Sequence, residues 1–224
     1  MKRIYTLIFF IFITTFAFSQ SQNDYSYSAG ISLFSYGEYP KLLNEVRSSD
    51  SYRTSAFNGL IFKFNDNQIS YRILGSLYSN DDYSFKNLCK DCETVTGKFK
   101  QFSAKFGFER NIIYGTVQPF YGLDLGFKKI NFSGTSRDQS NTPLYDIEIE
   151  KNGGVIYPFL GVKVNLIKAR LTFSAEAGID ILYSHDKETR TNNGNPPDIN
   201  NYKRWGFYNK PLGMFGLQFN FGTQ

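Results

Sequence analysis

The sequence predicts an all-β protein, specifically an eight-stranded antiparallel up-and-down transmembrane β-barrel. Three observations lead to this prediction. Apolar and polar residues alternate with a period of two in eight separate segments, the pattern of strands with one apolar face. The connections between these segments alternate between short turns and long polar stretches. An apolar leader begins the chain, and no later stretch of about 18 apolar residues would form a membrane helix.

The leader has the organisation of a signal peptide. Lys2 and Arg3 precede an apolar run from Ile4 to Phe16, and a small residue, Ser19, stands before the expected cleavage point. We therefore expect residues 1–19 to be removed as a signal peptide and residues 20–224 to form the exported barrel domain. Cleavage removes two of the 25 basic residues, which leaves 23 against 20 acidic residues. These bases are scattered, so nucleic acid is not an expected partner.

Eight alternating segments follow in order along the exported chain. The first is the clearest, because Tyr25, Tyr27 and Ala29 alternate with serines. Each run, roughly 9 to 14 residues, is close to the length that a tilted strand needs to cross a bilayer. We expect strands around 25–33, 56–64, 69–77, 102–108, 121–127, 156–166, 171–183 and 215–221.

The connections predict the orientation of the barrel. Short turns are expected at 65–68, 111–118 and 167–170, and long polar loops at 35–53, 79–96, 133–152 and 184–203. Strict alternation places all long loops on one side, which is the extracellular side in outer-membrane barrels. Both termini are then expected in the periplasm.

The charged residues of the strands are expected to face the lumen, because the apolar positions between them face outward. An eight-stranded barrel is just wide enough to be filled by side chains, so buried charges there must pair. We expect Lys105 to pair with Asp124, and Lys163 to meet Glu176 only diagonally. A competing interpretation places these charges on the solvated surface of a soluble sheet. The expected lumen network contains Arg72, Lys105, Glu109, Asp124, Lys128, Lys163, Glu176 and Asp180.

Aromatic residues stand where the strands are expected to meet the two surfaces of a bilayer, and the chain is rich in them, at 18%. Tyrosine and tryptophan side chains favour this boundary, because one end of the ring is apolar and the other polar. Ordinary aromatic core content is the alternative. The expected girdles contain Tyr25, Tyr27, Tyr36, Tyr121, Tyr183, Trp205, Phe219 and Phe221.

Two further motifs are candidate sites of chemistry. Cys89 and Cys92 lie in the second long connection and, in an exported chain with only these cysteines, favour a small disulfide-closed loop over free thiols or a metal site. Ser184 and the single histidine, His185, suggest a lipid-modifying barrel enzyme as an alternative. Adjacent residues of a strand point to opposite faces, however, so the two side chains are poorly placed to cooperate. No catalytic residue, metal or cofactor is expected.

The chain resembles the bacterial outer-membrane β-barrel domain family, the small eight-stranded OmpA/OmpX-like members of the porin-like superfamily. An export signal, four hairpins with long outer loops and a last strand from Met214 to Phe221 carry the resemblance, which spans the exported chain. The chain departs from the family in continuing Gly222-Thr223-Gln224 after its last aromatic residue, where such families usually end. The resemblance implies a monomer inserted into outer-membrane lipid by the barrel-assembly machinery.

From these observations we expect a non-enzymatic integral outer-membrane protein. Its role would be structural, or would depend on contacts between the long loops and an extracellular partner that the sequence does not identify. The alternatives are a small porin-like channel, an exported soluble lipocalin-like ligand-binding barrel, and the lipid-modifying enzyme.

Overall fold

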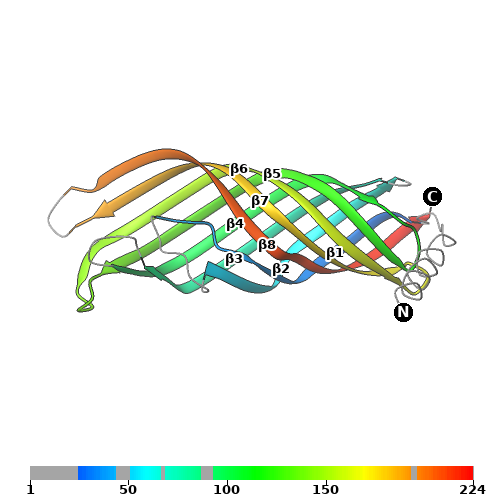
Figure 1. Ribbon diagram of the computed structural model, residues 1–224, viewed down its shortest axis with the longest axis horizontal. Helices are drawn as coiled ribbons and strands as arrows, with labels where there is room; N and C mark the ends of the chain where they lie inside the picture. The colour runs from blue at the N-terminus through cyan, green and yellow to red at the C-terminus, as the bar shows by residue number, and fades with distance from the viewer. Residues whose placement is uncertain (1–24, 44–50, 67–68, 87–92, 193–195, 224) are drawn as a thin grey trace, which may run out of the picture.

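The computed structural model is a closed barrel of eight antiparallel strands in up-and-down order (Figure 1). It describes residues 25–43, 51–66, 69–86, 93–192 and 196–223. Each strand pairs with the next, and the last pairs with the first, which confirms the predicted eight-stranded topology. No helix among the described residues is long and apolar enough to cross a membrane. The strands are β1 (Tyr25–Glu38), β2 (Tyr52–Asp66), β3 (Ile69–Lys86), β4 (Thr94–Asn111), β5 (Val117–Arg137), β6 (Pro143–Leu166), β7 (Leu171–Thr191) and β8 (Asp198–Thr223).

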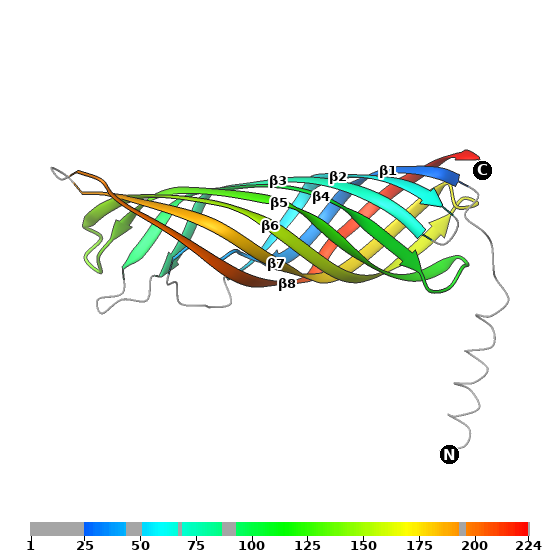
Figure 2. The ribbon, with the colours of Figure 1, turned by 90° about the horizontal axis from the view of Figure 1, so that it is seen from above.

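The short turns lie together at one end of the barrel. The connections from β2 to β3, β4 to β5 and β6 to β7 span only 67–68, 112–116 and 167–170, as predicted. The start of β1 and the end of β8 pair at the same end, at Tyr25 and Thr223 (Figure 2).

Three of the predicted long loops, 79–96, 133–152 and 184–203, are wrong over most of their length, because strands run through them. The fourth, 35–53, is entered by strands only at its two ends. At the other end of the barrel, the described residues outside strands are 39–43, 51, 93, 138–142, 192 and 196–197. The period of two continues in the three wrongly predicted loops with its polarity reversed. On β4, for example, Lys98 and Lys100 are exposed whereas Val95 and Phe99 are fully buried. A search for strands with apolar outer faces and charged inner faces misses such segments.

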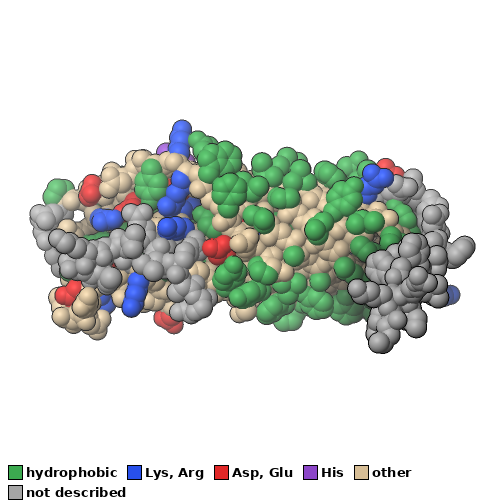
Figure 3. All heavy atoms as spheres, viewed as in Figure 1, with side chains coloured by type: hydrophobic (Ala, Val, Ile, Leu, Met, Phe, Trp, Pro, Cys, Tyr) green, Lys and Arg blue, Asp and Glu red, His purple; other side chains and the backbone are tan. Residues whose placement is uncertain are grey.

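The barrel therefore has two sections. The belt section, at the end with the short turns, has apolar residues on its outer face. The extension continues six of the strands beyond it and has mostly polar residues on its outer face. In the space-filling view, hydrophobic side chains cover the middle of the molecule and charged ones gather beside them toward one end (Figure 3). The extension comprises residues 78–86, 94–101, 129–137, 143–153, 184–191 and 198–204.

An aromatic and aliphatic core fills the extension. Part of this core comes from the chain after β1, where Tyr39, Leu42 and Leu43 are buried against the inner faces of the longer strands. The Lys41 carbonyl accepts hydrogen bonds from Lys151 and Arg204, which fixes this segment inside. The remaining buried members of the core in the extension are Tyr83, Phe85, Val95, Phe99, Ile130, Phe132, Ile147 and Ile149, and Val155, Leu182 and Tyr208 continue the core into the belt section.

The barrel wall changes where the belt section meets the extension. Pairing between β2 and β3 starts at Asp66 and Ile69 and ends at Gly59 and Ser76. Beyond that point β2 pairs only with β1, and β3 pairs only with β4. The extension is therefore a curved sheet of β3 to β8. The wall between β2 and β3 has no backbone pairing from Gly59 and Ser76 toward the extension.

Candidate functional site

The lumen of the belt section holds a network of six charged side chains, which we call the lower network. It contains three cations, Lys63, Arg72 and Lys163, and three carboxylates, Glu109, Asp124 and Glu176. All six are buried. Strands β2 to β7 each contribute one member, since the period of two directs every second side chain inward.

Arg72 is the centre of the lower network. Its Nε and Nη2 donate to the two oxygens of Asp124 at 2.8 and 2.7 Å, the two-pronged geometry that suits a guanidinium. Its Nη1 donates to Glu176 at 2.6 Å and to Glu109 at 3.3 Å. Lys63 and Lys163 bind the other side of Glu109, at 2.7 and 2.5 Å. Three positive and three negative charges therefore balance, as buried ions require.

Inward aromatic rings surround this network. The Arg72 guanidinium lies 3.6 Å from the centre of the Phe159 ring, and Lys163 Nζ lies 4.8 Å from that of Phe120. Such contacts between a cation and a ring face are attractive. Room for Phe120 comes from Gly161, where a Cβ atom would overlap the ring. These inward aromatics were not predicted, although their alternation with the outward residues Tyr121 and Leu160 marks them as inward.

A second group of charges, the Asp180 cluster, lies between the lower network and the extension. Lys105 and Lys210 each approach the Asp180 carboxylate to 3.0 Å, and Lys128 also binds it. Three cations thus converge on one carboxylate. Further along, Asp186 is held by Lys151 at 2.9 Å and Arg204 at 2.6 Å.

All eight residues of the expected lumen network face the interior, but the expected pairings are wrong. Lys105 lies opposite Gly126 rather than Asp124, and it binds Asp180, which is three strands away. Asp124 binds Arg72. Lys163 and Glu176 both contact other partners across the lumen. Charges in a narrow barrel meet across the interior, so pairing between neighbouring strands is a poor guide to their partners.

Several interior charges were not among the expected network. Lys210, Lys151, Asp186 and Arg204 lie within, or close to, segments expected to be loops. Continuing the period of two from Asp180 places Asp186 on the same inner face, a signal that was available in the sequence.

The expected girdle residues are placed as follows. Tyr27, Tyr121, Phe219 and Phe221 are exposed near the short-turn end, and Tyr25 is partly buried there. Tyr36, Tyr183 and Trp205 are exposed near the border with the extension. The Tyr183 and Trp205 rings lie 4.8 Å apart, side by side on β7 and β8.

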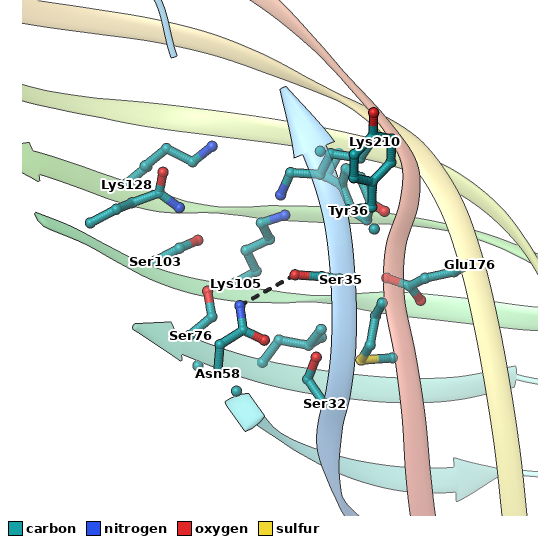
Figure 4. Close-up of a pocket in the computed structure, with 18 of the residues that line it drawn as sticks. Ser32, Ser35, Tyr36, Asn58, Ser76, Ser103, Lys105, Lys128, Glu176 and Lys210 are labelled. Carbon is teal, nitrogen blue, oxygen red and sulfur yellow. Dashed lines mark hydrogen bonds between the residues drawn. The ribbon is translucent and has the colours of Figure 1, made fainter. Parts of the chain in front are cut away.

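A cavity of about 70 Å³ lies beside the Asp180 cluster. Its lining includes Lys105, Lys128 and Lys210 together with Ser103 and Tyr157. Figure 4 shows Lys105 and Lys128 extending from neighbouring strands into the same space. Ser32 and Ser35 of β1, Asn58 of β2 and Ser76 of β3 also line the cavity (Figure 4).

The remaining motifs are not brought into a site. His185 is exposed on the outer face of β7, whereas Ser184 is buried on the inner face, as expected for adjacent strand residues. Cys89, Cys92 and residues 1–19 lie outside the described residues.

No protein-family model matches the chain, and neither does any curated protein.

Proposed function

We propose that the protein is an integral outer-membrane barrel with a closed lumen, which carries a rigid extension into the extracellular space. Its role is non-enzymatic, either supporting the envelope or presenting the extension to a surface partner. One observation carries this proposal: the polarity of both faces reverses at the same level of the strands.

The outer face of the belt section is suited to hydrocarbon. Leu60, Ile73, Phe106 and Leu160 are all more than 60% exposed there, on four different strands. Soluble monomers rarely expose a continuous apolar surface of this extent. In a bilayer the same surface is buried, and closure of the sheet satisfies the backbone groups that lipid cannot. The exposed apolar surface favours the membrane protein over the soluble ligand-binding barrel.

A row of basic side chains next to the belt supports the same placement. Lys129, His185 and Lys203 lie in one cross-strand row through Asn152, from β5 to β8. The row beside it, nearer the belt, contains Phe127, Tyr183 and Trp205. Aromatic rings beside cations suit the boundary between hydrocarbon and anionic lipid headgroups.

The interior favours a closed barrel over a channel. The lower network bridges the lumen of the belt section, and the aromatic core fills the extension. An eight-stranded barrel has little interior left once side chains fill it. We expect no stable single-channel conductance in planar bilayers, and a steady conductance would favour the porin-like alternative.

Cell-surface labelling tests the membrane placement and its orientation together. An epitope inserted in the connection from β5 to β6, at Gln139, is expected to bind antibody on intact cells. The matched control carries the same epitope in the short turn from β4 to β5, at Ile113, and is expected to bind only after the outer membrane is opened. Recovery of the untagged protein in the soluble periplasmic fraction would overturn the proposal.

A further inference from the structure

The cavity beside the Asp180 cluster is bordered by an excess of positive charge. Lys105, Lys128 and Lys210 share the single carboxylate of Asp180, and Arg53 also lines the cavity. Two further carboxylates line it: Glu176 and Glu38.

Glu176 does not offset this charge, because it is bound by Arg72 in the lower network. Glu38 lies at the rim, where its Oε2 accepts a hydrogen bond from the Asn209 backbone. Even with Glu38 counted, four cations face two carboxylates, so this part of the described interior has an excess of two positive charges. The lower network, by contrast, is balanced. Buried charge without a counter-charge is costly, and a bound anion would remove that cost.

Unpartnered polar atoms point to the same ligand. Ser103 and Tyr157 are 3% and 2% exposed, and neither hydroxyl has a hydrogen-bond partner within the described structure. The Nη1 atom of Arg53 and the Oδ1 atom of Asn58 are also buried without a partner. The hydroxyls of Ser103 and Tyr157 and the Nη1 atom of Arg53 can donate hydrogen bonds, and buried donors in proteins normally have an acceptor.

The cavity lies against the barrel wall where the pairing of β2 with β3 ends. Its lining includes Leu60 and Gly75, which pair with each other, Gly59 and Ser76, the last pair, and Asn58, beyond the last pair. Next to Asn58, the backbone of Phe57 has a φ of 50°, a conformation that non-glycine residues rarely adopt, and its side chain is 74% exposed.

We propose that this cavity binds a small anionic group of the phosphate or carboxylate class, held by Lys105, Lys128 and Lys210 with donors from Ser103 and Arg53. The volume of about 70 Å³ is enough for roughly five water-sized spheres at 10–15 Å³ each, which suits a group of phosphate size. The source of the group is either a free anion or the headgroup of a lipid at the unpaired wall between β2 and β3. The inference does not depend on the membrane placement.

Binding is tested with the full exported chain folded in a zwitterionic detergent. Inorganic phosphate is titrated calorimetrically, and native mass spectrometry measures retention of phosphatidylglycerol against phosphatidylcholine. Saturable binding of phosphate alone identifies a free anion as the source. Retention of phosphatidylglycerol over phosphatidylcholine identifies a lipid headgroup. Either result supports the site, provided that it depends on the cavity residues.

Three variants test that dependence. K210Q removes the most exposed of the three lysines and is expected to weaken binding by about tenfold, the order for one charge-assisted hydrogen bond. S103V removes a hydroxyl that has no partner, so the barrel is expected to fold normally while binding weakens by a few-fold. The matched control, K163Q, removes a buried lysine of the lower network that does not line the cavity, and is expected to leave binding unchanged.

Folding of each variant is checked by heat-modifiable migration on gels. If K210Q does not fold, S103V alone decides the dependence on the cavity. Absence of saturable binding to both probes, or equal binding by the wild type and the folded cavity variants, would overturn the site. Neither result would bear on the membrane proposal, which the surface-labelling experiment tests separately.

Discussion

The belt section and the extension are two lengths of the same strands with opposite chemistry on their faces. On β5 the belt section has Leu125 outside and Asp124 inside, whereas the extension has Asn131 outside and Phe132 inside. The backbone pairing of β5 with β4 and β6 is continuous across this change. The period of two thus predicts a strand in both sections. An apolar outer face indicates hydrocarbon around the belt section, and an apolar inner face indicates water around the extension.

The two sections also differ in how their interiors are held together. In the belt section, ion pairs and aromatic rings fill the lumen, and the apolar groups are left for the outside. In the extension, an ordinary apolar core supports the sheet, as in a soluble protein. The following predictions test whether each section depends on its own kind of interior.

Breaking the lower network is expected to have the largest effect. R72L leaves the carboxylates of Asp124 and Glu176 buried without their cation. We expect the free energy of unfolding to fall by about 3–5 kcal/mol, measured by urea titration of the protein folded in lipid. The control is K98A in the extension, whose ion pair with Asp81 is largely exposed and is worth about 0–1 kcal/mol. Equal losses in the two variants would contradict the account of the belt interior.

Opening a cavity in the core of the extension is expected to cost a similar free energy, but to loosen the extension alone. F99A removes a fully buried ring from the apolar core, at about 3–5 kcal/mol. We expect faster proteolysis of the extension while the belt section stays protected. The matched control F102A lies on the same strand but on the outer face of the belt, and it is expected to leave the extension protected. Equal proteolysis of both variants would show that Phe99 does not support the extension.

The next largest effect is expected from an arginine on the outer face, which should cost more stability in the belt section than in the extension. L125R places an arginine in the belt and is expected to cost about 2–4 kcal/mol of folding free energy in lipid. N131R places the same residue on the outer face of the extension, where a surface substitution costs less than about 0.5 kcal/mol. Both are measured by reversible unfolding from vesicles. Similar values for the two would contradict a hydrocarbon environment for the belt.

The smallest effect concerns high pH and is confined to the extension. Burial and, second, a hydrogen bond with Tyr78 together raise the pKa of Tyr39 from its usual 10.0 to about 12. Burial also raises the pKa of Tyr145 to about 12. Because the folded state favours the neutral phenol, the stabilisation is complete below pH 10 and is lost as the pH rises through 12.

Tyrosinate absorbance and protease protection of the extension, followed together, check this prediction. We expect the extension to lose protection between pH 10 and pH 12 while the belt section stays protected. Y39F removes one of these ionising groups and is expected to retain protection to higher pH. A wild type and a Y39F variant that open at the same pH would contradict a role for Tyr39.

The belt section was largely predictable from the sequence, and the extension was not. Alternation at positions such as Tyr121, Leu123 and Leu125 identified the strands, their order and the inward charges between them. The extension was interpreted as loops because its outer face is as polar as a loop. The sequence does carry a signal for these strands: apolar residues such as Val95 and Phe99 recur at every second position on the inner face.

The partners of the interior charges could not be predicted for a different reason. Lys105 binds Asp180, 75 positions away in the sequence and three strands around the barrel. Such a contact depends on how far the strands tilt as the barrel closes. The spacing of residues along one strand does not determine that tilt. The cavity likewise depends on where β2 and β3 separate, which the alternation of either strand alone does not show.

We propose that the belt section lies in hydrocarbon and the extension in water. Trp205 is the only tryptophan of the chain, so a W205F background makes single probes possible. Tryptophan is then placed on the outer face of β5 at one of two positions, as L125W or N131W, and the protein is folded into vesicles of brominated lipid. We predict strong quenching of L125W and little quenching of N131W, which aqueous iodide should quench instead. Equal exposure of both probes to iodide, with no quenching by lipid, would contradict the account.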